Sequence, residues 1–166
     1  HIRRAGATPS FKGYYGYPST VCISIDREVV HGIPGHRTIR EGQVVSVDAG
    51  AVVDGYHGDA ARTFIVGPRP SKDHERLYDL AIAAIQHGET CLLPGAKGMD
   101  IYNEVKGVFE REGMAAQFPG HAGHGLGLSP HEAPLFIPAS EDVVEEGDVV
   151  TLEPGLYVPG IGGVRC

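Results

Sequence analysis

The sequence predicts an α+β domain in which short strands at both ends of the chain flank two central helices. Apolar runs bounded by turn residues occupy the first third and the last part of the chain, whereas apolar residues recur at helical spacing between residues 71 and 113. There is also an internal repeat, because residues 41–55 match residues 146–160 at a constant offset of 105, with 7 identities in 15 positions. The repeat suggests two similar halves that meet around a shared site.

The first strands are predicted from apolar runs that end at turn residues. Val21–Ile25 and Val44–Asp48 are both rich in β-branched residues, which favours strands. Residues 51–53 lead into Asp54-Gly55, a dipeptide typical of tight hairpin turns. The return strand is expected from about residue 58 to residue 66, and a later strand at Val149–Leu152.

Two helices are predicted in the middle of the chain. Ser71 is a good N-cap for the first, which then repeats apolar residues at helical spacing until Pro94-Gly95 interrupts the pattern. The second carries an apolar stripe that includes Ile101 and Phe109, and Gly113 is expected to end it.

Length and composition indicate one ordinary globular domain over residues 1–166. The chain is 42% hydrophobic and 21% charged, with a net charge of -7 and no basic stripe, so nucleic acid is not an expected partner. No apolar run approaches the ~20 residues that a membrane span needs, so a membrane is not expected either. Three widely spaced cysteines, Cys22, Cys91 and Cys166, suggest free thiols in a reducing cytoplasm. Since the chain starts at His1 and ends without an obvious stop, we expect a partial domain that is incomplete at both ends.

Asp48 and Asp59 are the first residues that suggest chemistry. They lie almost symmetrically about Asp54-Gly55, so an antiparallel hairpin would place them face to face on one side of the sheet. Two such carboxylates repel each other unless a cation lies between them. The alternative is that both side chains lie on a solvated face or cap turns.

Two further residues complete a possible ligand set, and a third could assist them. His124 is flanked by glycines in 123–127, which would let backbone or a ligand approach the imidazole, and Glu153 ends an apolar strand where a buried carboxylate needs a partner. His131 can ligate a metal or transfer protons near neutral pH. A glycine-flanked histidine is otherwise an ordinary loop residue.

Asp48, Asp59, His124 and Glu153 together offer several oxygens and one nitrogen, which suits Co, Mn, Fe or Zn. Three carboxylates would balance two divalent ions better than one, and a two-metal site polarises a carbonyl and supplies hydroxide at neutral pH. No GxSxG or GxxxxGK[ST] motif occurs, and the glycines at 123–127 are not followed by a helical pattern.

These residues resemble the pita-bread metallopeptidases, which include methionine aminopeptidases and Xaa-Pro peptidases. The similarity covers nearly the whole chain and is specific in its order and spacing. Its carriers are Phe11–Pro18, Val29–Pro34, Asp48 through Asp59, Gly123–Gly125, His131–Pro134 and Glu153-Pro154.

The resemblance implies a fold of two pseudo-symmetric halves around a curved antiparallel sheet, and a role for each residue. Asp48, Asp59, His124 and Glu153 match four of five metal ligands, with Asp59 bridging the ions. His31 and His131 match the catalytic histidines that contact the substrate and the tetrahedral intermediate. Tyr14, Tyr17 and Cys22 match positions that line the pocket for the amino-terminal side chain.

The fifth ligand, a bridging glutamate, is not found in residues 1–166. The Gly-Val-Arg ending at 163–165 and the internal repeat both place it just past Cys166. It is the best candidate for taking the proton of the water and passing it to the leaving nitrogen, so we expect no activity from these residues alone unless another segment supplies that glutamate.

The resemblance implies a monomeric aminopeptidase that removes the first residue, preferably methionine, from a peptide or nascent protein. The first half is similar to type I methionine aminopeptidases, and the second half is closer to Xaa-Pro peptidases. Pro130 stands where methionine enzymes usually have an aromatic residue, and Gly120, beside His121, where many Xaa-Pro enzymes have a histidine. The alternatives are an Xaa-Pro peptidase, a pita-bread module that binds peptides without metals, and a folded fragment without activity.

Overall fold

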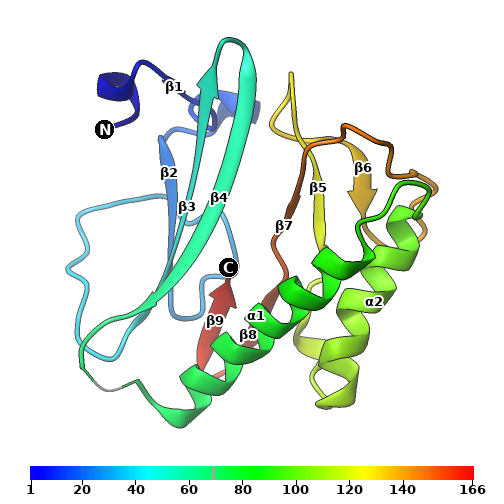
Figure 1. Ribbon diagram of the computed structural model, residues 1–166. Coiled ribbons are helices and arrows are strands. Elements are labelled where there is room, and N and C mark those ends of the chain that lie inside the picture. Colours follow the sequence, from blue (N-terminus) through cyan, green and yellow to red (C-terminus); the bar gives the residue numbers. More distant parts are fainter. Residues whose placement is uncertain (69) are drawn as a thin grey trace.

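The computed structural model describes residues 1–68 and 70–166, which form antiparallel sheets backed by two helices (Figure 1). The strands are β1 (Thr8–Pro9), β2 (Val21–Ile25), β3 (Val44–Val53), β4 (Tyr56–Ile65), β5 (Gly123–Gly125), β6 (Glu132–Phe136), β7 (Val150–Leu152), β8 (Gly155–Val158) and β9 (Gly162–Arg165). The helices are α1 (Lys72–Cys91) and α2 (Gly98–Arg111), with short 3-10 turns at Ile2–Ala5, Tyr14–Gly16 and Ala115–Gln117. The predicted α+β class with both helices in the middle is confirmed.

The first sheet is built around the long hairpin of β3 and β4. One edge of β3 pairs with β4. The opposite edge pairs with β2 along residues 45–49 and with β1 at residues 51–52. Asp54 and Gly55 form the turn with φ of 52° and 88°, as the dipeptide predicts. The predicted pairing of Asp48 with Asp59 is wrong, because Asp48 lies opposite Ala61 and Asp59 opposite Gly50. The two carboxyl groups are therefore diagonal neighbours, and they still share one face of the sheet.

Both predicted helix boundaries follow from their capping residues. The Ser71 side chain accepts a hydrogen bond from the His74 backbone N–H at 3.2 Å, which caps α1 as predicted. Beyond α2, Gly113 adopts a φ of 70° while the Met114 N–H donates to the Phe109 carbonyl. The buried stripes of the two helices, including Leu77 and Phe109, form the main core with Phe136 and Leu156.

The repeat corresponds to two different local structures. The first copy is β3 with its turn, whereas the second is interrupted between β7 and β8 at Glu153-Pro154. Proline lacks the backbone N–H that a continuous ladder requires, so the second copy divides between two sheets, β6-β5-β7 and β8-β9.

The two halves meet where β9 packs against the first sheet (Figure 1). The Arg165 N–H donates to the Thr63 hydroxyl at 3.1 Å, and that hydroxyl donates to the Arg165 carbonyl at 2.6 Å. The Gly163 N–H donates to the Asp26 carbonyl at 2.7 Å. These contacts bring the end of β9 to the middle of β3, next to Asp48.

Neither helix in the described parts of the chain combines the length and the apolar character that crossing a membrane requires. Cys22, Cys91 and Cys166 are free thiols, as expected from their spacing.

Candidate metal centre

A pocket of about 920 Å³ lies between the two halves and contains the predicted site. Except for His124, every residue that the sequence singled out lines this pocket. These residues are Tyr14, Tyr17, Cys22, His31, Asp48, Asp59, His131 and Glu153. His124 lies behind the wall, where its ring centroid is 4.1 Å from that of His131 and its Nε2 is 3.6 Å from Glu153 Oε1. The structure thus brings together residues that are up to 139 positions apart in the sequence.

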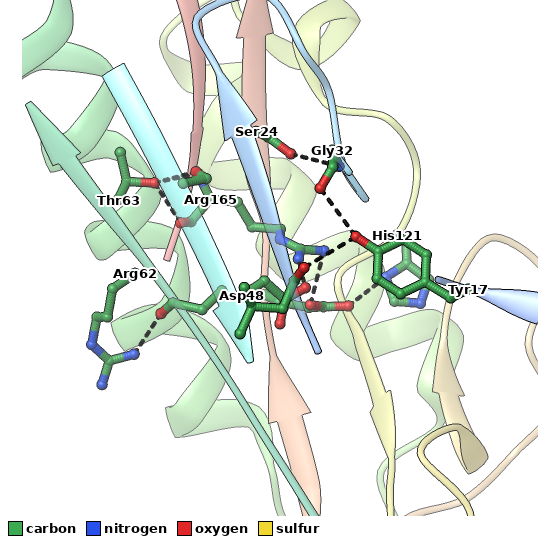
Figure 2. Close-up of polar contacts among 12 residues, drawn as sticks. Tyr17, Ser24, Gly32, Asp48, Arg62, Thr63, His121 and Arg165 are labelled. Carbon is green, nitrogen blue, oxygen red and sulfur yellow. Dashed lines mark hydrogen bonds and ion pairs between the residues drawn. The ribbon is translucent and has the colours of Figure 1, made fainter. Parts of the chain in front are cut away.

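Arg165 is the cation that joins the carboxylates of the two halves. Its guanidinium contacts Asp48 Oδ2 directly, as Figure 2 shows, and its Nη1 lies 3.2 Å from Glu153 Oε2. All three side chains are buried. Burial alone would disfavour the charge of Arg165, but Glu153 and Asp48 outweigh that effect and raise the pKa of the guanidinium.

Asp59 adds a third carboxyl group to the same face of the sheet. Burial, the charge of Asp48 and a hydrogen bond to Asp48 together raise the pKa of Asp59 to about 8. Burial also raises the pKa of Glu153, against the effect of Arg165. Three acidic groups therefore compete for one guanidinium, and protonation of Asp59 limits the negative charge of the cluster while no further cation is present.

Glycines hold His124 where β5 passes between its neighbours. A Cβ on Gly123 would lie 2.0 Å from the Thr151 carbonyl oxygen, and one on Gly125 would lie 2.2 Å from that of Ala133. Only glycine lets β5 fit so closely between β6 and β7. The His124 ring is fully buried, and its Nδ1 lies 2.8 Å from the Gly125 carbonyl oxygen. Because a carbonyl only accepts, the proton lies on Nδ1, which leaves the Nε2 lone pair directed at the cluster.

The donor atoms of this cluster fit divalent cations. His124 Nε2 and Asp48 Oδ1 are buried and have no hydrogen-bond partner within the described chain. Leaving such atoms unpaired is costly unless a ligand satisfies them. Carboxylate oxygens with one imidazole suit Mn, Fe, Co or Zn, and ionising all three carboxyl groups requires more positive charge than the one guanidinium supplies.

His31 is placed at the pocket by the residue that follows it. The Gly32 carbonyl accepts from the Ile23 N–H at 2.8 Å. It also accepts from the Tyr17 hydroxyl at 3.0 Å, and the Gly32 N–H donates to the Ser24 hydroxyl, as Figure 2 shows. A Cβ on Gly32 would lie 2.2 Å from the Ile23 carbonyl oxygen, so this close contact with β2 requires glycine. His31 itself adopts a φ of 57°, an uncommon conformation for a residue with a side chain.

His131 lies on the opposite wall, between two other rings. Its ring stacks on Tyr14 with centroids 5.7 Å apart and 12° between the planes, and it also contacts the ring of His124. Partial burial and the neighbouring His124 and His31 lower the pKa of His131 to about 4. Its imidazole is therefore neutral near pH 7 and can donate one N–H into the pocket.

Tyr17 and Cys22 form the wall beside Asp48. Cys22 is the cross-strand partner of Asp48, so the two side chains lie on the same face of the sheet. Burial raises the pKa of the Cys22 thiol, and the nearby charge of Asp48 raises it further. Cys22 is therefore a neutral apolar wall residue and a poor nucleophile.

Arg165 and His121 were not among the predicted site residues. His121 Nδ1 lies 3.5 Å from Glu153 Oε1, and its ring lies 5.7 Å from that of His124. Burial, together with His124, lowers the pKa of His121 to about 4. For Arg165, the available signal was its position directly after Val164 at the end of β9, where a buried charge requires carboxylate partners.

We expect Arg165→Met to destabilise the metal-free protein by about 3–5 kcal/mol, because Asp48 and Glu153 would stay buried without a cation. Urea unfolding in the presence of a chelator measures this change. Arg62→Met is the matched control, since Arg62 is exposed and should change stability by less than about 0.5 kcal/mol. Equal stability of the Arg165 variant and the wild type would show that this guanidinium does not balance the carboxylates.

Comparison with known proteins identifies the family. The model of metallopeptidase family M24 matches residues 1–166. The chain belongs to metallopeptidase family M24. It is 35% identical over 157 residues to methionine aminopeptidase 1 of Bacillus subtilis, covering 92% of this chain and 62% of that protein.

Solved structures of both predicted subgroups share the fold of this M24 chain. Methionine aminopeptidase from Thermotoga maritima matches with a TM-score of 0.83 and 29% identity, covering 99% of this chain and 73% of the other. Prolidase from Pyrococcus furiosus matches with a TM-score of 0.83 and 31% identity, covering 87% of this chain and 43% of the other. The predicted pita-bread fold and the predicted family are confirmed. The chain spans about 62% of the Bacillus subtilis relative.

Proposed function

We propose that this M24 chain forms the active site of a metal-dependent aminopeptidase that removes an amino-terminal residue, methionine in the first place, from peptides or nascent proteins. The observation that carries the proposal is the pair of buried, unpartnered donor atoms, His124 Nε2 and Asp48 Oδ1, beside a substrate-sized pocket. The relative named methionine aminopeptidase 1 supports the same activity.

Asp48, Asp59, His124 and Glu153 would hold two divalent ions, chosen among Co, Mn, Fe and Zn. Once bound, such ions polarise a peptide carbonyl and generate a nucleophile from water at neutral pH. The chain itself contributes the remaining functions. The free amino group of a peptide, in its neutral form, would bind beside one of the ions, which favours cleavage at the first residue.

The histidines contribute from the two walls of the pocket. His131 is neutral, so it donates an N–H to the oxygen on which negative charge develops during amide cleavage. His31, held by Gly32 against β2, faces the same space and contacts the substrate. Neither imidazole has to carry a charge for these roles.

The pocket wall is suited to a medium-sized apolar side chain. Phe11, Tyr14, Tyr17 and Cys22 line it together with Leu135. A thioether packs favourably against aromatic rings, which supports methionine as the first residue of the substrate.

An Xaa-Pro peptidase is the second candidate. It is supported by the fold similarity to Pyrococcus furiosus prolidase and by Pro130 at the position where an aromatic wall would favour methionine. In that case the residue after the scissile bond would be proline, and the first residue would matter less.

A peptide panel tests the two candidates. We expect hydrolysis of Met-Ala-X peptides and slower hydrolysis of Ala-Pro-X peptides, measured as kcat/KM with Mn²⁺ or Co²⁺ present. The panel is run on residues 1–166 and on a version extended past Cys166 with a segment that supplies the bridging glutamate. A preference for Ala-Pro-X would support the Xaa-Pro candidate. Metal binding without hydrolysis by either version would contradict the proposed catalytic function, and absence of metal binding would support a peptide-binding module.

A further inference from the structure

A second group of metal-ligating side chains lies between the two helices. His87 and Cys91 are on the last turns of α1, and Glu104 is on α2. The ligand atoms of these three residues all lie within 4.8 Å of one another. Among the described residues, no member of α1 or α2 lines the pocket, so the group is separate from the candidate metal centre.

The helix geometry brings the three side chains together. His87 and Cys91 are four residues apart, which places them on the same face of α1. Between them, Gly88 lets the helices approach closely, because a Cβ there would lie 2.9 Å from Val105 Cγ2 of α2. That contact fixes Glu104, the neighbour of Val105, opposite the face that carries His87.

Two hydrogen bonds already hold the three side chains near one another. His87 Nε2 lies 2.8 Å from Glu104 Oε2, and the Cys91 thiol donates a 3.4 Å hydrogen bond to the His87 carbonyl. A metal would replace the proton in the first contact and the thiol proton in the second, releasing both to solvent. The side chains can adjust to a metal, because His87 and Cys91 are only partly buried and Glu104 is exposed.

The chemistry of the group selects the ion. One thiolate sulfur, one imidazole nitrogen and one carboxylate oxygen match the ligands of Zn²⁺, with a fourth position left for water. The end of α1 also favours a cation, since the helix dipole is negative there and its last turn contains no basic residue.

We propose that His87, Cys91 and Glu104 bind Zn²⁺ and clamp α1 to α2, at a site distinct from the candidate metal centre. The three ligands come from both helices, so binding stabilises their packing without any contact to the pocket. The ion would act on stability, whereas the ions of the pocket act on substrate.

Cobalt titration of the whole chain tests the proposal, because a thiolate bound to Co²⁺ produces a sulfur-to-cobalt charge-transfer absorption. We expect this absorption in the wild type and its displacement by Zn²⁺, which binds more tightly. Cys91→Ser should abolish it, and Glu104→Gln should weaken Co²⁺ binding by at least about 10-fold. Cys22→Ser is the matched control and should retain it. An absorption that survives in Cys91→Ser, or is absent from the wild type, would overturn the proposal.

Thermal melting provides a second readout that does not depend on the pocket. In a His124→Ala background, which removes a predicted ligand of the main centre, Zn²⁺ should still raise Tm by mass action. The same addition should not raise Tm in the His124→Ala, Cys91→Ser double variant. Equal shifts in both proteins would place the stabilising Zn²⁺ elsewhere. Failure of the aminopeptidase proposal would leave this comparison unaffected.

Discussion

Replacing His124 with alanine is expected to weaken Mn²⁺ binding by more than about 100-fold, because loss of even an outer-shell partner commonly reduces metal affinity by about 10–100-fold. His124 offers the unpartnered Nε2, and the backbone contact of its Nδ1 fixes both the tautomer and the ring orientation. Metal content after equilibration with Mn²⁺ and desalting, together with calorimetric titration, measures the change.

Mn²⁺ is chosen because it prefers oxygen and nitrogen donors over thiolate, so the His87, Cys91 and Glu104 group should contribute little to the signal. His36→Ala is the matched control, since His36 is exposed and outside the pocket lining. Circular dichroism checks that the variant folds, because His124 is fully buried. A folded His124→Ala protein that keeps full Mn²⁺ content would contradict the assignment of this residue as a ligand.

The local elements of this fold follow closely from the sequence. The Asp54-Gly55 turn, the Ser71 cap and the Gly113 stop act within a few residues, so their effects can be inferred without knowledge of tertiary structure. The pairing of Asp48 with Asp59 was wrong by one step on each strand. A tight hairpin centred between Asp54 and Gly55 places Asp48 opposite Ala61.

The sequence did not predict the site residues that depend on contacts between the two halves, Arg165 and His121. Arg165 lies on β9 and reaches Asp48 only because β9 hydrogen bonds to Thr63 of β4. His121 reaches Glu153 because the chain before β5 lies beside the end of β7, where the Glu153 N–H donates to the Ala122 carbonyl. Neither contact is encoded by spacing along the chain.

The two repeated segments place their equivalent acidic residues, Asp48 and Glu153, in different local structures. Asp48 occupies the interior of a continuous strand, whereas Glu153 precedes Pro154 at a break between two sheets. The break turns Glu153 towards the first half, where Arg165 contacts both carboxylates. The position of the Glu153 carboxylate in the site therefore depends on the strand break at Pro154 as well as on the acidic residue itself.

His131→Ala is expected to reduce kcat by about 10²–10³-fold with little change in KM, the pattern for loss of a donor that acts on developing negative charge. The ring is held against Tyr14 and His124, and its lowered pKa of about 4 keeps it neutral. The measurement is steady-state hydrolysis of Met-Ala-X peptides by the version extended past Cys166.

His131→Asn separates this role from a purely structural one, because the asparagine amide keeps an N–H donor while it loses the aromatic stacking. If donation to the oxyanion is the function, the asparagine variant should regain part of kcat, whereas a role in packing alone predicts equal losses in both variants. Unchanged kcat with a raised KM in His131→Ala would instead assign the residue to substrate binding. Because the His131 ring contacts that of His124, Mn²⁺ content is measured in each variant, so that a loss of metal is not mistaken for a loss of the donor.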